Sequence, residues 1–230
     1  MTQETETGGA VLDSLANIAD EKMSIMEVVN ESDSWFILIP LLLMSIYAIY
    51  IFVERFMTLR KADKEEKIFM TQIKNYVQQG DLNGAKNLCT TTDSPVSRMV
   101  EKGISRIGKP MADISASIEN VGKLEVSKLE NNLAAIATIS GLAPMIGFLG
   151  TVIGMVEVFY KLKVEGMQGN FLESLSGGIM KAMVTTVAGL IVGIMTYFFY
   201  NYLVSKISKV VQNMEAHSID FIDILEEPGK

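Results

Sequence analysis

Two threonines lie in two long apolar stretches of the sequence, where polar side chains are rare. Thr151 is six residues before Glu157, and Thr186 is five residues after Lys181. In helices with a rise of about 1.5 Å per residue, these separations are about 9 Å and about 7.5 Å. If Glu157 and Lys181 lie near the same membrane surface, both threonines lie at one depth on antiparallel helices. A ring of identical subunits would then have a polar belt at that depth.

Small residues accompany these threonines at helical spacing. In the first stretch Gly147 precedes Thr151 by four residues, and the second stretch carries a continuous stripe of Gly178, Ala182, Thr186, Gly189 and Gly193. Small side chains let helix backbones approach closely in lipid, and a threonine hydroxyl often bonds to its own helix. Spacing alone therefore favours ordinary helix packing. The polar belt favours a pore, whose predicted lining is Thr151, Thr186, Ala182, Gly147, Gly189 and Gly193.

The charges at the ends of these stretches lead to a second hypothesis. Glu157 and Lys181 have matched depths, so we expect an ion pair between them at the mouth of the pore. Residues 134–156 and 182–205 carry no charge and no histidine. Moving a proton through lipid requires a group that binds and releases it. If this chain conducts protons, a partner protein must therefore supply the titrating carboxylate.

The elements that position these residues are membrane-spanning helices. Hydrophobic residues make up 49% of the 230-residue chain, with a mean hydropathy of +0.28, and they are concentrated in three runs. A span needs about 20 apolar residues, and the predicted spans are 35–53, 134–157 and 175–203. The alternative, buried core helices, would need a large soluble domain around them. We therefore predict an all-α integral membrane protein with three transmembrane helices and long cytoplasmic helical extensions.

Basic residues predict the orientation in the membrane. Residues 1–34 hold one basic and eight acidic residues, whereas the first span is followed by Arg55, Arg60, Lys61, Lys64 and Lys67. The positive-inside rule puts the N-terminus in the periplasm and residues 54–133 in the cytoplasm. Residues 158–174 become a short periplasmic loop, and residues 204–230 a cytoplasmic C-terminal helix and tail. For residues 1–34 two alternatives stay open, an interfacial helix on the outer membrane face and a flexible acidic arm.

Residues 54–133 have the periodicity of helices joined by short connections. An apolar stripe over residues 68–77 predicts a helix that Gly80 ends, and Asp81 is a candidate N-cap for the next helix. Residues 90–95 have the composition of a loop.

A longer helix is predicted to connect this region to the second span. From Met111 to Leu133 apolar residues recur at helical spacing, and no helix breaker stands between this helix and the second span until Gly141. This pattern predicts one unbroken helix that leaves the membrane and continues into the cytoplasm. The tail after Leu203 has a similar stripe, so the two extensions should pack as an antiparallel pair.

Composition argues against several classes of function. A net charge of -7 argues against binding to nucleic acid, whose phosphates are also negative, so no nucleic-acid partner is expected. Cys89 is the only cysteine and His217 the only histidine, so we predict no disulfide, no metal site and no cofactor. Because the spans lack a nucleophile motif and paired carboxylates, we predict that the chain is not an enzyme. A solute transporter would have more spans and internal repeats, and a passive membrane scaffold is the remaining alternative.

Two membrane motifs resemble those of a known family. Residues 142–159, LAPMIGFLGTVIGMVEVF, resemble the second transmembrane motif of ExbB and TolQ proteins, and residues 177–194, GGIMKAMVTTVAGLIVGI, resemble the third. The resemblance covers roughly residues 35–210. Three spans rather than four favour ExbB or TolQ over MotA. The chain is thus similar to the ExbB/TolQ branch of the MotA/TolQ/ExbB proton channel family, with ExbB as the nearest relative.

The resemblance implies a set of partners in the cytoplasmic membrane of a Gram-negative cell. The chain would form a homo-oligomer, expected to be a pentamer, whose pore encloses the single helices of an ExbD-like or TolR-like dimer. That partner would carry the aspartate that takes up the proton. Work would pass through a TonB-like protein to outer-membrane import or, in the TolQ branch, through a TolA-like protein to envelope maintenance.

The resemblance also assigns residues. The family's pore threonines match Thr151 and Thr186, and its membrane proline matches Pro144, to which we assign a structural role in the second span. One position departs from the pattern, because Lys181 stands where many members have a glutamate. No proton role is therefore carried over to this position, and a lysine there could hold a partner carboxylate or change its proton affinity.

Overall fold

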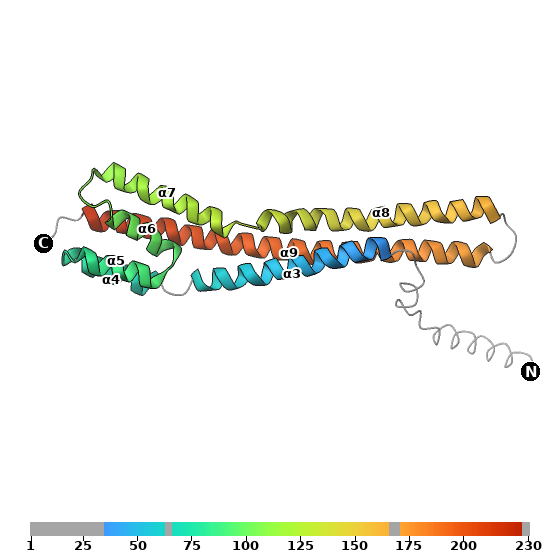
Figure 1. Cartoon of the computed structure of the whole chain (residues 1–230), viewed down its shortest axis with the longest axis horizontal. Coiled ribbons are helices and arrows are strands. Elements are labelled where there is room, and N and C mark those ends of the chain that lie inside the picture. Colours follow the sequence, from blue (N-terminus) through green and yellow to red (C-terminus); the bar gives the residue numbers. More distant parts are fainter. Residues whose placement is uncertain (1–34, 63–65, 166–170, 227–230) are drawn as a thin grey trace, which may run out of the picture. The chain divides into compact units, whose positions relative to one another are not determined.

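The computed structural model describes residues 35–62, 66–165 and 171–226, and every element in those ranges is a helix (Figure 1). The helices are α3 (Trp35–Ala62), α4 (Glu66–Gln78), α5 (Leu82–Thr92), α6 (Pro95–Ile104), α7 (Met111–Leu129), α8 (Leu133–Glu165) and α9 (Phe171–Glu226). The predicted all-α fold class is therefore confirmed. The N-terminal segment 1–34, for which an interfacial helix and an acidic arm were the alternatives, lies outside the described residues.

Three stretches are long and apolar enough to cross a membrane, as the sequence predicts. They lie within Trp35–Arg60, Met111–Val164 and Leu175–Glu226. Their apolar side chains are largely uncovered: Phe36 is 86% exposed and Ile194 is 68% exposed. Exposed apolar surface of this extent is stable only against lipid or another apolar protein surface. The chain is an integral membrane protein.

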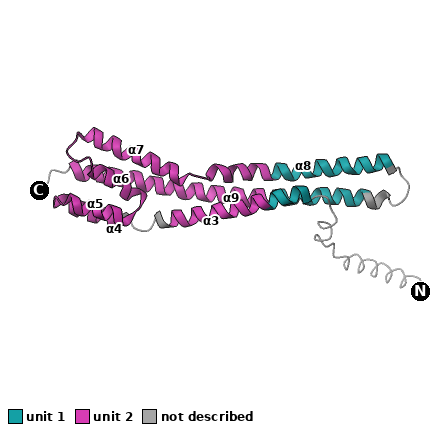
Figure 2. Ribbon diagram, viewed as in Figure 1, with its two compact units in different colours: residues 1–42, 144–191 teal, residues 43–143, 192–230 magenta. Residues whose placement is uncertain are grey.

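The chain divides into two compact units, which Figure 2 distinguishes by colour. The first unit takes in residues 1–42 and 144–191, and the second takes in residues 43–143 and 192–230. The first unit therefore contains most of α8 and the beginning of α9. The second contains α4 to α7 and the remainder of α9.

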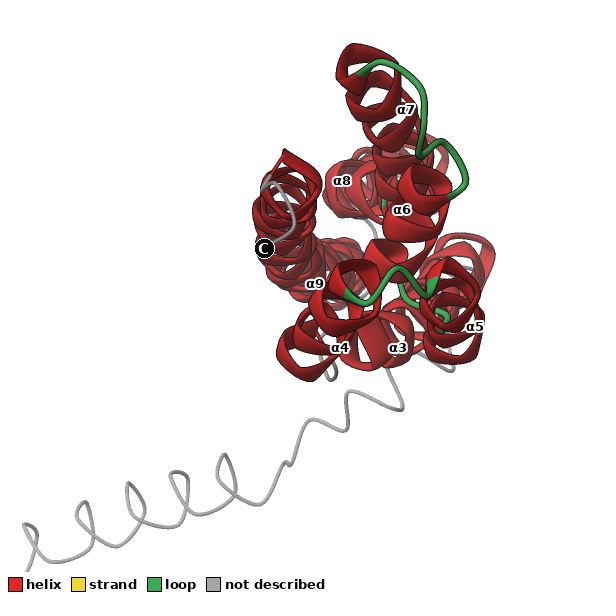
Figure 3. Cartoon of the chain, turned by 90° about the vertical axis from the view of Figure 1, so that its left-hand side faces the viewer, coloured by secondary structure: helices red, strands yellow, loops and turns green. Residues whose placement is uncertain are grey.

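Short connections join the helices of the second unit, coloured as loops in Figure 3. Gly80 has a φ of +72°, and the Asp81 side chain accepts a hydrogen bond from the Gly84 amide at 2.9 Å. The predicted helix end and N-cap are thus confirmed. The predicted loop at residues 90–95 is shorter in the structure. Helix α5 continues through Thr92, and α6 begins at Pro95 with Ser94 as its N-cap.

The prediction of one unbroken helix from Met111 into the second span is wrong. Helix α7 ends at Leu129 and α8 begins at Leu133, and between them Asn132 has a φ of 65°. Asparagine adopts this left-handed conformation more readily than most residues, so it can end a helix without a glycine or a proline. Arg55 of α3 donates to the carbonyl oxygen of Lys128 at 3.1 Å and so satisfies one carbonyl at the end of α7.

Most of the segment 158–174, which the sequence predicts to be a loop, is helical and belongs to α8 and α9. Helix α8 continues to Glu165 and α9 begins at Phe171, while residues 166–170 lie outside the described residues. The sequence pattern does not locate the end of α8 or the start of α9, because apolar residues continue beyond the length that is needed to cross the membrane. Helix α9 is 56 residues long and includes the third span and the predicted C-terminal helix in one element.

A hydrophobic core holds the second unit together. The tail of α9 contributes a buried stripe, as predicted, that includes Leu203, Ile207, Val210 and Met214. This part of α9 runs antiparallel to α7 (Figure 1). At Gly103 of α6 an added Cβ would collide with Phe221 of α9 and Ile118 of α7, so a glycine is needed where the three helices meet.

Candidate functional site

Helices α8 and α9 of the first unit approach so closely that their backbones touch. A Cβ added at Gly147 of α8 would lie 2.9 Å from the carbonyl oxygen of Thr185 and 3.0 Å from the Cα of Gly189, both on α9. One added at Gly154 would lie 2.9 Å from the Cβ of Ala182. Close approach of this kind is what small residues permit between helices in lipid. The small-residue stripes of the two spans therefore face each other within a single chain.

This arrangement locates four of the residues predicted to line a pore. Gly147, Ala182 and Gly189 are buried at the contact between α8 and α9, and Gly193 is buried in the second unit. The helix faces that carry these four residues are therefore already covered by other parts of the same chain in the isolated subunit. In the single chain they act in helix packing, the role that their spacing alone favours.

The two predicted pore threonines are half-buried, and their hydroxyl groups have different partners. Thr186 donates across the helix contact to the carbonyl oxygen of Gly147 at 3.1 Å. Thr151 donates to the carbonyl oxygen of Phe148 in its own helix at 2.7 Å. A Cβ added at Gly150, the residue before Thr151, would collide with the side chain of Thr185, the residue before Thr186. The two predicted pore threonines therefore lie at similar levels of the helix pair.

Sequence reasoning did not single out the neighbouring threonine, Thr185. Its side chain is only 2% exposed, and its hydroxyl donates to Ala182 at 2.7 Å and approaches the Gly147 carbonyl oxygen at 3.4 Å. Two adjacent threonines thus direct their hydroxyl groups to one carbonyl on the other helix. The sequence held one signal for this role: Thr185 follows Ala182 by three residues and so lies on the same helical face.

The charged residues proposed for the pore mouth lie at comparable depths. A Cβ added at Gly178 of α9 would collide with Val158 of α8, which sets the level of Glu157 near that of Gly178. Lys181 is one turn further along α9. Glu157 is exposed, and Lys181 is half-buried and has an interaction partner in the structure. Pairing of Glu157 with Lys181 stays a prediction.

Pro144 lies inside α8, which continues on both sides of it. Because proline has no amide hydrogen, the helix lacks one hydrogen bond at this turn. Around Pro144 the surface of α8 is apolar and open, and four exposed neighbours line a shallow depression, namely Met145, Phe148, Leu149 and Val152. The proline thus accompanies an apolar face that is uncovered in the single chain.

A buried charge cluster in the second unit was not found by sequence reasoning. Glu125 of α7 is 3% exposed and accepts from Arg98 of α6 at 2.7 Å and from Lys128 at 2.7 Å. Burial disfavours the charged carboxylate, but the hydrogen bonds from Arg98 and Lys128 outweigh this effect and lower the pKa of Glu125. Periodicity alone assigns such residues to solvent, so the cluster had no signal in the sequence.

Residues that could perform covalent chemistry or bind a metal ion are few in the described ranges. Burial, with a further contribution from Glu101, raises the pKa of the Cys89 thiol to about 12. A thiol in that state is a poor nucleophile. Within residues 35–62, 66–165 and 171–226, no three His, Cys, Asp or Glu side chains gather as metal ligands.

The pattern of the MotA/TolQ/ExbB proton channel family matches residues 91–216. This is more than half of the chain, and it includes all of α8 and most of α9. The matched region thus contains the contact between Gly147 and Gly189, both threonines and the buried Glu125.

Several curated proteins are similar to the chain. The biopolymer transport protein ExbB of Aquifex aeolicus is 35% identical over 44% of this chain and 69% of its own length. ExbB of Neisseria meningitidis serogroup A is 24% identical over 80% of this chain and 88% of its own length. The Tol-Pal system protein TolQ of Haemophilus influenzae is 31% identical over 44% of this chain and 43% of its own length. The chain spans less than half the length of several curated relatives that it matches.

Proposed function

Since the chain belongs to the MotA/TolQ/ExbB proton channel family, we propose that it is the ring-forming channel and stator subunit of a motor driven by the proton-motive force. With a single-span ExbD-like partner, it energises TonB-dependent import across the outer membrane. The partner forms a dimer inside a pore that is built from several copies of this chain, with a pentamer expected. The motor lies in the inner membrane, with the N-terminus in the periplasm and the C-terminus in the cytoplasm.

The observation that carries this proposal is the chemistry of α8 and α9. Their membrane segments, residues 134–156 and 182–205, contain threonines and glycines but no group that titrates near neutral pH. A proton path through such walls needs an acid from another polypeptide. In the proposed motor the partner helix brings that acid, and Thr151 and Thr186 form the polar wall opposite it.

Packing supports the assignment of separate roles within the two helices. Gly147 and Gly189 hold α8 against α9 in one rigid pair. The half-buried threonines at the edge of this contact are the residues that a central helix could reach. On this proposal Ala182 and Gly193, which are buried within the chain, support the wall from behind, and Glu157 and Lys181 set the charge at the periplasmic mouth.

The driving force is sufficient for such a device. One elementary charge that crosses the membrane releases about 2.3 kcal/mol per 100 mV. This is several times the thermal energy, and it can bias a helix between two packed arrangements. Rotation of the partner relative to the ring would convert proton flow into work.

A second candidate is the TolQ-type subunit of envelope maintenance. The similarity to TolQ of Haemophilus influenzae, at 31% identity, is comparable to that of the ExbB relatives. In this branch the partners are TolR-like and TolA-like proteins. A passive membrane scaffold is a third candidate, and it requires no proton movement at all.

The test is reconstitution of the full chain in vesicles that contain a pH-sensitive dye. Alone, the ring should be nearly proton-tight. Together with an ExbD-like single-span protein, proton uptake should appear, and it should disappear when that partner's membrane aspartate is replaced with asparagine. Full proton flux without any partner would overturn the proposal. Co-purification with a TonB-like or a TolA-like protein separates the two branches, and absence of proton movement with every partner indicates a scaffold.

A further inference from the structure

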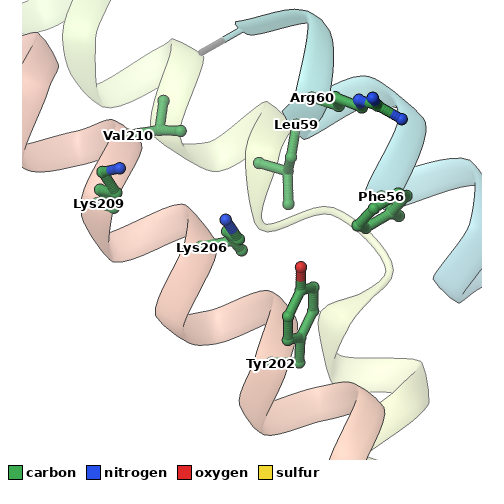
Figure 4. A pocket seen from close by; sticks show the side chains of 7 residues that line it. All are labelled: Phe56, Leu59, Arg60, Tyr202, Lys206, Lys209 and Val210. Atoms are coloured by element: carbon green, nitrogen blue, oxygen red, sulfur yellow. The ribbon is translucent and has the colours of Figure 1, made fainter.

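A pocket between α3 and α9 in the second unit brings together three cations and two aromatic rings. Its lining is Phe56, Leu59, Arg60, Tyr202, Lys206, Lys209 and Val210. Figure 4 shows the Tyr202 hydroxyl and the Lys206 ammonium group directed into the space between the two helices. Leu59 and Val210 are 5% and 3% exposed and form a closed apolar base.

The cations of this pocket are not neutralised by the described protein. Arg60, Lys206 and Lys209 are exposed, and none of the three takes part in an ion pair within the residues that the structure describes. Lys206 lies over the Tyr202 ring, with its Nζ 5.9 Å from the ring centroid. The arrangement holds positive charge around a cavity, and an anion is the ligand that complements it.

The apolar side of the pocket continues into the membrane-facing surface. Tyr202 contacts Phe56 and Phe198, with ring centroids 6.1 Å and 6.4 Å apart, and Phe199 stacks on Phe52 at 4.2 Å. Phe198 is 64% exposed. Along α9 the surface thus changes from apolar, through aromatic, to cationic within about three helical turns. Aromatic residues of this kind are typical of the boundary between lipid and water.

We propose that this pocket binds the phosphate headgroup of an anionic phospholipid. Lys206, Lys209 and Arg60 contact the phosphate, and the acyl chains lie along Phe198 and the neighbouring apolar side chains. On the topology proposed above, the lipid belongs to the cytoplasmic leaflet. Because lysines on α9 and an arginine on α3 share one anion, the bound lipid links the first and third spans.

Charge and position favour a lipid over the other possible occupants. A free phosphate would use the cations but would leave the aromatic side of the pocket unused. An acidic segment of a second chain would also match the cations. However, these basic side chains lie beside an apolar, membrane-facing surface, which an acidic segment would not complement. A phospholipid has both properties in one molecule and is present at high local concentration.

The test compares lipid retention by the full chain and its variants in mild detergent, with native mass spectrometry as the readout. The probes are phosphatidylglycerol, phosphatidylethanolamine and inorganic phosphate. Wild type should retain phosphatidylglycerol in preference to phosphatidylethanolamine. Lys206→Gln combined with Lys209→Gln should weaken this retention roughly thirtyfold, since each basic residue near an anionic membrane surface contributes a factor of about five. Lys206→Arg combined with Lys209→Arg should retain the lipid, which also verifies that these positions tolerate substitution.

A matched control separates this pocket from general attraction to basic residues. Lys161→Gln combined with Lys163→Gln removes the same charge from two exposed lysines at the far end of α8, and it should leave retention unchanged. Equal loss in this control, or wild-type retention in the Lys206 and Lys209 variant, would overturn the proposal. Displacement of the lipid by inorganic phosphate would identify a soluble-anion site instead. If Lys206→Cys of one copy crosslinks to Arg60→Cys of another copy and no lipid is retained, a second chain is the occupant and the proposal is overturned.

Discussion

The hydroxyl oxygen of Thr186 lies 3.1 Å from the carbonyl oxygen of Gly147, and it donates a hydrogen bond from one membrane-spanning helix to the next. The same two helices touch at Gly147 and Gly189. A threonine that is assigned to the pore wall is therefore also part of the contact that holds the wall together. Stability and activity must be measured separately at this position.

Replacement of Gly147 should destabilise the α8–α9 pair. In Gly147→Ala the new Cβ would lie 2.9 Å from a backbone carbonyl oxygen, and backbone atoms cannot rotate away as a side chain would. We expect a loss of about 1–3 kcal/mol in the free energy of unfolding, the usual cost of overpacking. Thermal unfolding in detergent, followed by circular dichroism, measures it. Gly141→Ala is the control, because no atom lies within 4 Å of the added Cβ; an equal effect of both substitutions would contradict the packing role.

Removal of the Thr186 hydroxyl should reduce activity far more than stability. Hydrogen bonds between membrane helices contribute only about 0.6 kcal/mol on average, so Thr186→Val should unfold at nearly the wild-type temperature. Partner-dependent proton uptake in vesicles should fall strongly, and Thr186→Ser should restore it. The comparison is Thr138→Val, which removes an exposed hydroxyl bonded only to its own helix. Unchanged uptake by Thr186→Val would exclude this threonine from the proton path.

Neutralisation of Glu125 should weaken the second unit and change its response to acid. The lowered pKa means that ionised Glu125 stabilises the folded chain above its ordinary pKa of 4.5. This stabilisation is lost as the pH falls through the lower, folded-state value. Glu125→Gln should cost about 1–3 kcal/mol at neutral pH, because it weakens two charge-assisted hydrogen bonds at a buried position, from Arg98 and from Lys128, while Arg98 keeps its exposed pair with Asp93.

Unfolding of Glu125→Gln measured from pH 7 to pH 3 checks this prediction. Wild type should lose stability below about pH 4.5, whereas the variant should show a smaller decline. Glu119→Gln is a suitable control, since Glu119 forms an exposed pair with Lys123 on the same helix and its loss should have little effect. Parallel pH curves for wild type and Glu125→Gln would contradict the assigned role.

The break between α7 and α8 should depend on the backbone freedom of residue 132. Asn132 has a φ of 65°, which a branched side chain adopts only with strain. We expect Asn132→Val to lower the free energy of unfolding by about 1–2 kcal/mol and Asn132→Gly to be neutral or slightly stabilising. Thermal unfolding of the two variants decides the matter. If valine is tolerated as well as glycine, residues 130–132 do not need the left-handed conformation.

Much of the fold could be predicted because lipid imposes simple requirements on a sequence. Three runs of about 20 apolar residues are sufficient to identify three spans, and Gly80 with Asp81 marks a helix boundary by local chemistry alone. The prediction of one unbroken helix from Met111 is wrong, because the chain leaves the helical conformation at Asn132. Asparagine can end a helix by its own conformation, but most asparagines do not. The hydrogen bond from Arg55 to the Lys128 carbonyl that accompanies this helix end joins residues far apart in the chain, and periodicity does not reveal it.

The sequence by itself determined the membrane character of the chain, its two motifs, and the absence of charged residues and histidine from residues 134–156 and 182–205. These properties depend on residue type and on separation along one helix. Only the tertiary structure decided that Gly147 contacts Gly189, that Thr185 shares a carbonyl with Thr186, and that Glu125 is buried. Each of these relationships joins residues far apart in the chain, and the rotation of one helix against another selects which faces meet.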